Sequence, residues 1–344
     1  MHKIAVIVPV HNEELCVLDT IKALLKANVP AKDIFVVDDA SKDKTRELVM
    51  GTNVNFLGLT KNGGKANAQR QVISYFDLCD KYDYVVFLDG DTIVDPGFLR
   101  ALQSAAEVYR GISLFVGQVK STRAGYISAC RSVEYTVGHD LYKAGQSNFG
   151  LIFVAPGCVS MYKTRMLKKL KLEYDTLAED MDLTMQVHRH GGKVMYVPDA
   201  IVYTQDPASI KDYIKQVIRW QRGGWQVFKK HKIGSWGKKQ AIDYMVLFLT
   251  ADAMLFNRIL WLGGALIFLP FEYSLMAITL EILVSFGIAC YAAIKNSRLD
   301  VVYKFPLYFW INYINIFTYF KTFYEVMIKK QNVLDWNKVK RFSN

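Results

Sequence analysis

The chain has 344 residues, a formal net charge of +11, and 51% hydrophobic residues. This length allows a large domain plus a further region. Residues 1 to about 235 mix charged and apolar residues as a soluble domain does, whereas 241 to 328 hold long, nearly uncharged apolar tracts. Much of the positive charge lies beside those tracts, which favours lipid headgroups over nucleic acid, for which no motif is present. The five cysteines lack Cys-x-x-Cys spacing, so neither a zinc site nor a disulfide framework is indicated.

The N-terminal half alternates apolar strand patterns with helical periodicity. This alternation predicts an α/β fold with a doubly wound, mostly parallel sheet. The expected elements are strand 3–10, helix 13–27, strand 34–38, helix 42–50 with Ser41 as its N-cap, strand 54–59, a helix entered through 63–65, and a strand that begins at 84.

Three of these strands end in polar residues, namely 9–13, 38–39 and 89–91. In a parallel sheet the three ends meet at one edge, where ligands bind. Asp89 and Asp91 supply two hard oxygen donors, and Gly90 between them lets the backbone approach closely, which suits a divalent cation bridging to a diphosphate. Taken alone, the Asp-Gly-Asp sequence is more typical of an ordinary loop, because Asp and Gly are turn residues whatever the function. The chain lacks both glycine-rich phosphate-binding patterns, so a metal held by aspartates is expected to serve the phosphates.

Six motifs in this order resemble those of family 2 glycosyltransferases with a GT-A fold. The resemblance covers about residues 3 to 230 and includes the Gln-x-x-Arg-Trp motif of the cellulose, chitin and hyaluronan synthase branch. There is also similarity to dolichyl-phosphate sugar transferases, which typically lack that motif. The motifs are Val-Pro-Val-His-Asn-Glu13, Val-Val-Asp-Asp-Ala-Ser41, Gly-Gly-Lys65-Ala-Asn-Ala68, Asp-Gly-Asp91, Leu-Ala-Glu-Asp180 and Gln-Val-Ile-Arg-Trp220.

The resemblance implies a nucleotide-sugar site with Mn²⁺ or Mg²⁺ as cofactor. Asp39 would hold the base or ribose, Asp38 would be structural, and Asp89 and Asp91 would bind the metal. Lys65 would add positive charge near the diphosphate, although a solvated lysine at a helix start is the alternative. The implied donor-binding residues are Pro9, His11, Glu13, Asp39, Lys65, Asp89, Gly90 and Asp91.

Asp180 is the candidate catalytic base, because the family inverts the anomeric centre and one carboxylate must take the acceptor's proton. With a phosphate as acceptor, Asp180 would orient it instead. Acidic residues at 179, 180 and 182 also suit the first turn of a helix, and both roles can hold at once. By the resemblance, Gly157, Cys158 and Glu179 would lie on the acceptor side.

Residues 210–228 have the pattern of an amphipathic helix lying at a membrane interface. By the resemblance, Gln216, Arg219 and Trp220 would be catalytic residues on this helix, with Arg219 reaching the diphosphate and Trp220 closing over the acceptor. An aromatic membrane anchor with snorkelling arginines is the alternative.

Three apolar segments, 244–269, 274–294 and 305–328, reach the length that a bilayer requires. The first contains Asp252, Asn257 and Arg258, and the second contains Glu281. The loop after the second segment and the C-terminal tail are both basic, and three spans cannot place both in the cytoplasm. The interrupted first segment is therefore the candidate for a re-entrant or interfacial one.

The expected organisation is a cytoplasmic catalytic domain (1–208), an interfacial helix region (209–240), a transmembrane region (241–328) and a basic tail (329–344). No signal peptide is expected, since the first residues run straight into a strand pattern. We expect a multi-pass protein of the cell membrane that contacts membrane lipids, and an oligomer is compatible with the sequence.

The sequence favours an inverting, metal-dependent glycosyltransferase with a nucleotide-sugar donor and a polyprenyl- or dolichyl-phosphate-linked acceptor, with mannose from GDP-mannose as the favoured donor sugar. The reason is that three apolar segments are too few to enclose a polymer. The alternative is a processive polysaccharide synthase that uses a UDP-sugar. An inactive membrane scaffold is a third reading, against which the intact set of charged motif residues argues.

Overall fold

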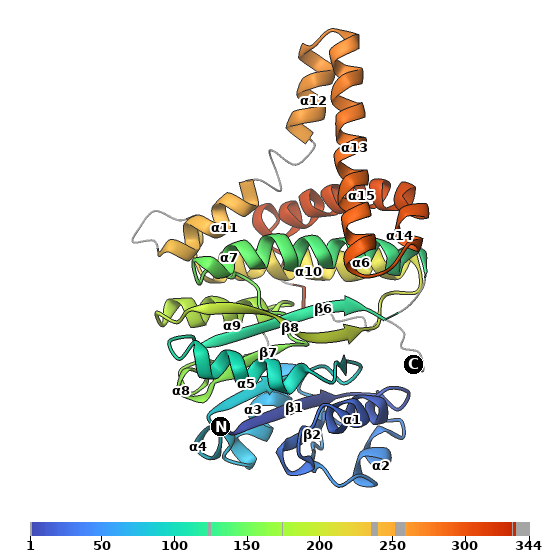
Figure 1. Ribbon diagram of the computed structural model, residues 1–344. Helices are drawn as coiled ribbons and strands as arrows, with labels where there is room; N and C mark the ends of the chain where they lie inside the picture. Colours follow the sequence, from blue (N-terminus) through green and yellow to red (C-terminus); the bar gives the residue numbers. More distant parts are fainter. Residues whose placement is uncertain are drawn as a thin grey trace. The chain divides into compact units, whose positions relative to one another are not determined.

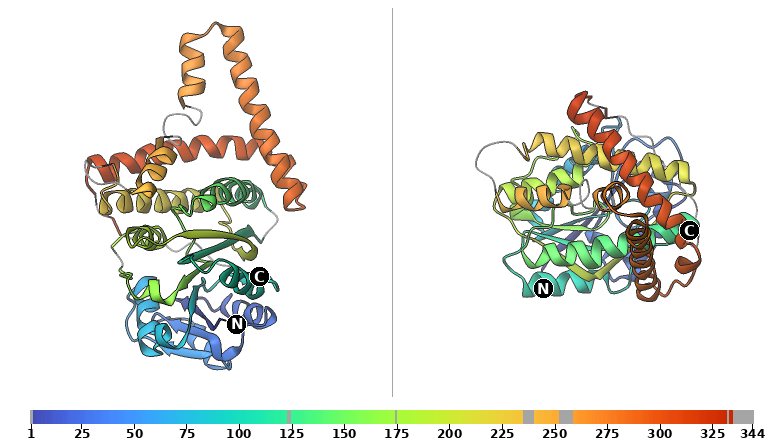
Figure 2. Two further views of the ribbon diagram at one scale, coloured as in Figure 1. Left: turned by 60° about the vertical axis from the view of Figure 1, so that its left-hand side comes forward. Right: turned by 90° about the horizontal axis from the view of Figure 1, so that it is seen from above.

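The computed structural model describes residues 2–122, 125–173, 175–234, 240–251, 259–331 and 333–334. The chain divides into two compact units (Figures 1 and 2). The first contains Met1–Thr122 and His139–Gln205, and the second contains Arg123–Gly138 and Asp206–Asn337.

The first unit is built on an eight-stranded sheet with the order β3-β2-β1-β4-β7-β6-β8-β5. The strands are β1 (Ile4–Val10), β2 (Ile34–Asp38), β3 (Asn55–Gly58), β4 (Tyr84–Phe87), β5 (Ile93–Val94), β6 (Leu114–Ser121), β7 (Ser160–Lys163) and β8 (Val194–Thr204). The pairs β3–β2, β2–β1, β1–β4 and β6–β8 are parallel, as predicted for the first strands of the chain. The sheet is nevertheless mixed, since β7 is antiparallel to β4 and β6, and β5 is antiparallel to β8.

Helices of the first unit connect these strands in the alternation that the sequence predicts. Their core contains Ala68 and Val72 of one helix and Leu183 and Val187 of another, packed with strand residues such as Val85. The helices are α1 (Val17–Lys26), η1 (Ala31–Asp33), α2 (Thr45–Met50), α3 (Lys65–Tyr75), α4 (Leu78–Lys81), α5 (Phe98–Val108), α7 (Ala144–Asn148), α8 (Thr164–Leu167) and α9 (Glu179–Arg189), with the π-helical turn η2 (Val137–Lys143) preceding α7.

The expected N-cap at Ser41 is wrong. Helix α2 begins at Thr45, and the Ser41 hydroxyl instead accepts a hydrogen bond from the Asn12 backbone N–H at 2.9 Å. Asp43 Oδ1 accepts from the Thr45 N–H at 3.0 Å, so the carboxylate two residues before the helix takes the place of a cap. The serine thus joins the loops that follow β1 and β2.

The second unit is helical. Its apolar core brings together residues far apart in sequence, among them Val133, Val217, Ala292 and Ile311. The helices are α6 (Tyr126–Thr136), α10 (Ile210–Lys230), α11 (Ala241–Ala251), α12 (Ile259–Phe268), α13 (Phe271–Lys295), α14 (Asp300–Tyr303), α15 (Phe305–Phe323) and the π-helical turn η4 (Tyr324–Ile328). Helix α10 confirms the predicted helix, and the Ser209 hydroxyl caps it by accepting from the Asp212 N–H at 3.1 Å.

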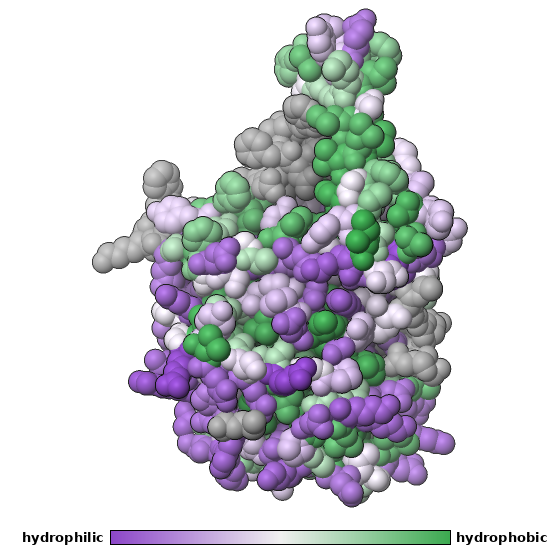
Figure 3. All heavy atoms as spheres, in the orientation of Figure 1, coloured by the Kyte–Doolittle hydropathy of each residue, from purple (hydrophilic) through white to green (hydrophobic). Residues whose placement is uncertain are grey.

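Within the described residues, one helix, α13, is long and apolar enough to cross a membrane. Its side chains gather as an exposed apolar surface in Figure 3, with Leu280, Leu283 and Val284 each at least half exposed. Three spans are not confirmed. The first predicted span is divided between α11 and α12, and Asp252, Asn257 and Arg258 lie outside the described residues. The third is the 19-residue α15, whose tyrosines and asparagines make it less apolar, followed by a π-helical turn.

Candidate active site

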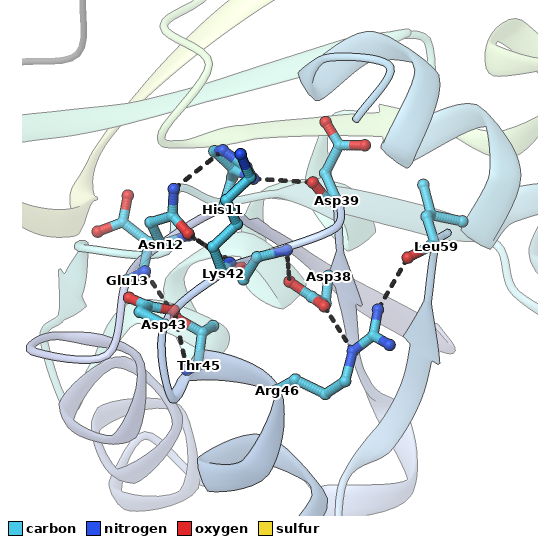
Figure 4. Close-up of polar contacts among 11 residues, drawn as sticks. His11, Asn12, Glu13, Asp38, Asp39, Lys42, Asp43, Thr45, Arg46 and Leu59 are labelled. Atoms are coloured by element: carbon cyan, nitrogen blue, oxygen red, sulfur yellow. Dashed lines mark hydrogen bonds and ion pairs between the residues drawn. The ribbon is translucent and has the colours of Figure 1, made fainter. Parts of the chain in front are cut away.

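Asp39 lies just beyond the end of β2, and its carboxylate is bound by backbone amides. Oδ1 accepts from the Gly63 N–H at 2.9 Å, and Oδ2 accepts from the Gly64 N–H at 2.7 Å. His11 Nδ1 is 2.8 Å from the Asp39 carbonyl oxygen, and since a carbonyl only accepts, this nitrogen carries the hydrogen. The loops after β1, β2 and β3 therefore meet at Asp39, and Figure 4 shows His11 beside the Asp39 carbonyl.

Asp38 binds different partners from those of Asp39. Its buried carboxylate accepts from the Ser41 N–H at 3.0 Å and from Arg46 Nε at 2.9 Å. Arg46 Nη2 also donates to the Leu59 carbonyl at 2.8 Å, which connects β2 to the residue after β3 (Figure 4). These contacts make Asp38 part of the scaffold.

Gly90 packs directly against the end of β1. A Cβ at this position would lie 2.8 Å from Val10 Cγ1 and 3.3 Å from the carbonyl oxygen of Pro9, so only glycine fits here. Thr20 Oγ1 donates to the Gly90 carbonyl at 2.9 Å. The two neighbouring carboxylates differ in exposure, since the Asp89 side chain is 35% exposed and Asp91 is buried.

Lys65 is ion-paired in this structure, which differs from the alternative of a solvated lysine. Nζ lies 2.5 Å from Asp89 Oδ1 and 3.6 Å from Glu179 Oε1, and it donates to the Gly157 carbonyl at 3.3 Å. Burial acts to lower the pKa of Lys65, but the Asp89 and Glu179 carboxylates outweigh it and raise the pKa above the ordinary lysine value. Lys65 thus joins the Asp-Gly-Asp motif to the Glu179-Asp180 motif.

Asp180 occupies the first turn of α9, where acidic residues are favourable. Its Oδ2 accepts from the Gly157 N–H at 3.1 Å. Burial, and next the charge of Glu179, raise the pKa of Asp180 to about 6, while Lys65 opposes the shift. A carboxylate with this pKa is mostly ionised at neutral pH yet more basic than an ordinary aspartate, which suits a general base.

Gly157 leaves room for the end of the Lys65 side chain, which a larger residue would displace. A Cβ here would lie 2.5 Å from Lys65 Nζ. The adjacent Cys158 is buried, and burial raises the pKa of its thiol, so this sulfur stays protonated and inert.

Lys143, in η2, is a neighbour of this cluster that sequence patterns did not indicate. Burial lowers the pKa of Lys143 to about 8, and the charges of Asp180 and then Cys158 oppose this shift. Single-turn π-helices frequently occur at functional sites, but η2 leaves no sequence signature that could have identified Lys143.

The donor set fits a divalent cation in part. Asp89 and Asp91, separated by Gly90, provide hard carboxylate oxygens. Asp89 is already paired with a positive charge, the ammonium of Lys65. Within the described ranges there is no group of three or more His, Cys, Asp or Glu that could hold a metal ion.

Gln216, Arg219 and Trp220 belong to α10 in the second unit. Gln216 Oε1 accepts from Arg131 Nη2, and the Arg131 guanidinium lies 4.5 Å from the centre of the Trp220 ring. Trp220 remains 40% exposed. The expected contacts of Arg219 with a diphosphate and of Trp220 with an acceptor stay predictions.

The mixed α/β sheet, with acidic residues beyond its strand ends, is consistent with a GT-A fold. Residues 2–223 match the family model described as "Glycosyltransferase like family 2". The chain therefore belongs to family 2 of the glycosyltransferases and is a glycosyltransferase.

The curated relatives include poly-beta-1,6-N-acetyl-D-glucosamine synthases. The protein from Staphylococcus epidermidis is 26% identical over 244 residues, which are 69% of this chain and 58% of that protein. The protein from Staphylococcus aureus strain COL is 25% identical over the same shares. The aligned region thus spans little more than half the length of these relatives.

Two solved structures share the fold. Mannosyltransferase PcManGT from Pyrobaculum calidifontis, in complex with GDP-Man and Mn²⁺, has a TM-score of 0.58 at 16% identity, covering 89% of this chain and 86% of that one. S. aureus TarS 1–349 in complex with UDP-GlcNAc has a TM-score of 0.52 at 16% identity, covering 96% and 92%.

Proposed function

We propose that this protein is an inverting polysaccharide synthase that transfers N-acetylglucosamine from UDP-GlcNAc to a hydroxyl of a growing glycan. The observation that carries the chemistry is the contact of Lys65 with both Asp89 and Glu179, which brings the diphosphate-side carboxylates and the candidate base Asp180 into one cluster. The choice of sugar and acceptor rests on the relatives, whose name specifies a polymer of N-acetylglucosamine.

In the proposed reaction Asp180 removes the proton of the acceptor hydroxyl, whose oxygen attacks the anomeric carbon as the bond to the diphosphate breaks. The raised pKa of Asp180 favours this proton transfer. Gly157 donates its N–H to Asp180 and fixes the direction in which the carboxylate points. A divalent cation held by Asp89 and Asp91 would supply Lewis-acid stabilisation to the leaving diphosphate.

Lys65 is proposed to pair with carboxylates or with the diphosphate, depending on whether the donor is bound. In the absence of donor it neutralises Asp89 and Glu179, and when the donor is bound its ammonium can pair with the diphosphate. Asp39, with its carboxylate fixed by the Gly63 and Gly64 amides, is proposed to receive the uracil base or ribose together with His11 and Glu13.

The lipid-phosphate acceptor and GDP-mannose, favoured by the sequence alone, have less support than the polymer. The relatives are named as synthases of a polymer. The only argument against a polymer was that three apolar segments are too few to enclose one, and that argument used this chain without its relatives. The exposed apolar helix α13 is compatible with a membrane location of this protein, whichever of the two products it makes.

The test is a product analysis with purified protein in detergent and Mn²⁺ or Mg²⁺. Radiolabelled UDP-GlcNAc and GDP-mannose are supplied separately, with and without dolichyl phosphate. We expect a high-molecular-mass product from UDP-GlcNAc alone that an enzyme specific for β-1,6-linked N-acetylglucosamine degrades. A product that is extracted into organic solvent, carries one sugar and requires the added lipid would refute the polymer and restore the lipid-linked acceptor.

A further inference from the structure

Arg131 of α6 is buried, and its guanidinium contacts two residues of the Gln-x-x-Arg-Trp motif at once. Nη2 donates to Gln216 Oε1, and the guanidinium carbon lies 4.5 Å from the centre of the Trp220 ring. The same carbon lies 4.5 Å from the centre of the Tyr213 ring, one turn before Gln216 on α10. A single side chain from another helix therefore touches both ends of the motif.

The guanidinium is itself held in place by Glu134. Arg131 Nη1 lies 2.8 Å from Glu134 Oε2. The other carboxylate oxygen, Oε1, accepts from the Tyr213 hydroxyl and from Asn315 Nδ2, the latter at 3.0 Å. Glu134 thus connects α6 with α10 and with α15, so the orientation of Arg131 depends on three helices of the second unit.

We propose that Arg131 is a positioning residue for the motif: it orients the Gln216 amide and the Trp220 ring for the acceptor, and Glu134 fixes Arg131. This inference rests on the proposed transfer reaction and on the predicted role of the Gln-x-x-Arg-Trp motif in it, and it adds residues from α6 and α15 to that motif. The planar guanidinium is suited to this task, because its edge donates to an amide oxygen while its face stacks on an indole. Trp220 keeps 40% of its surface exposed, so an acceptor can still reach it.

A purely structural role for Arg131 is the competing explanation, because breaking a buried ion pair destabilises a protein wherever it lies. The ion pair of Arg222 with Glu325 offers a matched control. It joins the same helix α10 to η4 at 2.6 Å, with side chains 19% and 17% exposed, and no described contact links it to Gln216 or Trp220. Both pairs should contribute to stability, whereas only Arg131 should affect transfer.

The experiment measures kcat, donor KM and melting temperature of the full chain with UDP-GlcNAc for Arg131→Met, Arg131→Lys and Arg222→Met. We expect Arg131→Met to lower kcat by about 10²-fold, as small misplacements of positioning groups do, with donor KM unchanged. Arg131→Lys keeps the positive charge but not the planar, multiply donating guanidinium, so its kcat should be roughly tenfold lower than that of the wild type. Arg222→Met should lower the melting temperature and leave kcat within about twofold.

A double-mutant cycle separates positioning from stability. If Arg131 acts through Gln216, Arg131→Met should add almost nothing to the loss already caused by Gln216→Leu, and the same should hold with Trp220→Phe. Losses that multiply, or an equal loss of kcat in Arg222→Met, overturn the proposal. If Arg131→Met does not fold, the cycle is run with Arg131→Lys, and full kcat in that variant overturns it. Full activity of Gln216→Leu and Trp220→Phe refutes instead the predicted catalytic role of the motif, and with it this proposal.

Discussion

Two groups of polar residues are built in different ways. The donor cluster of the first unit consists of Asp39, Lys65, Asp89, Asp91 and Asp180, and the arginine-centred network of the second consists of Arg131, Glu134, Tyr213, Gln216 and Asn315. Asp39 and Asp180 each accept hydrogen bonds from backbone amides of glycines in neighbouring loops. Asp39 lies just beyond the end of β2, and Asp180 lies in the first turn of α9. In the second unit Arg131, Glu134 and Tyr213 contact one another through side chains alone. The first arrangement orients Asp39 and Asp180 by backbone amides, and the second pairs its polar groups among side chains.

The difference teaches that the two regions should fail differently. A change in the donor cluster removes a group that acts on substrate, so it should change rate or donor affinity in a folded protein. A change in the network removes a partner of a buried charge, so its effect passes through the position and stability of other residues.

The largest expected effect is the loss of activity on removing the metal. EDTA should abolish transfer, Mn²⁺ or Mg²⁺ should restore it, and Asp91→Asn should lose most activity while its melting temperature is retained. Asp77→Asn, which changes a side chain that is 66% exposed, is the control and should behave as wild type. Full activity of Asp91→Asn in chelator would show that these carboxylates do not serve a metal.

Next in size is the replacement of Asp180 by asparagine, which preserves shape and removes the base. General-base loss typically lowers the rate by roughly 10²–10⁴-fold, and nucleotide binding measured by calorimetry should survive. Asp182→Asn is the matched control on the same helical turn, where the carboxylate accepts from Gln186 Nε2 at 2.8 Å. Equal losses in both variants would mean that the charge of the first turn, not a base, is what matters.

A smaller effect is expected in the dependence of kcat on pH. The rate should rise as Asp180 loses its proton near pH 6 and decline above about pH 8, where Lys143 loses its charge. Lys143→Arg keeps that charge, so the decline at high pH should disappear and the rate at about pH 9 should exceed wild type by a few-fold. An unchanged profile in this variant would show that the charge of Lys143 does not affect the rate in this pH range.

The smallest expected effect is on stability. The pKa of Asp180 is raised in the folded state, so its protonated form favours folding below about pH 4 and this contribution is lost as pH rises through about 6. Asp180→Asn should therefore melt a few degrees higher than wild type at pH 7 and at about the same temperature at pH 4. A lower melting temperature at pH 7 would contradict the electrostatic description of this residue.

Sequence patterns correctly predicted that the polar ends of three strands meet at one edge of the sheet, because the strands 3–10, 34–38 and the one that begins at 84 are parallel neighbours. They did not predict the reversed strand β7, whose apolar residues look the same in either direction. They also missed Lys143, since no periodicity marks a π-helical turn.

The arginine network was beyond sequence reasoning for a physical reason. Arg131 and Gln216 are separated by 85 positions, and Glu134 and Asn315 by 181. Polar residues on helices are usually solvated, and only the packing of α6 against α10 and α15 turns these into buried partners. Three apolar segments were likewise read as spans from length alone, although α15 places Tyr308 and Ile311 in the core of its own unit.

The central claim is a single-displacement transfer with Asp180 as the base, and the anomeric configuration of the product tests it most directly. The first product formed from the α-linked donor UDP-GlcNAc is isolated before any further reaction and examined by proton NMR. One in-line attack inverts the anomeric carbon, so the account predicts a β-linkage in the wild type and in the slow product of Asp180→Asn. An α-linkage would require retention of configuration and would contradict the role of Asp180.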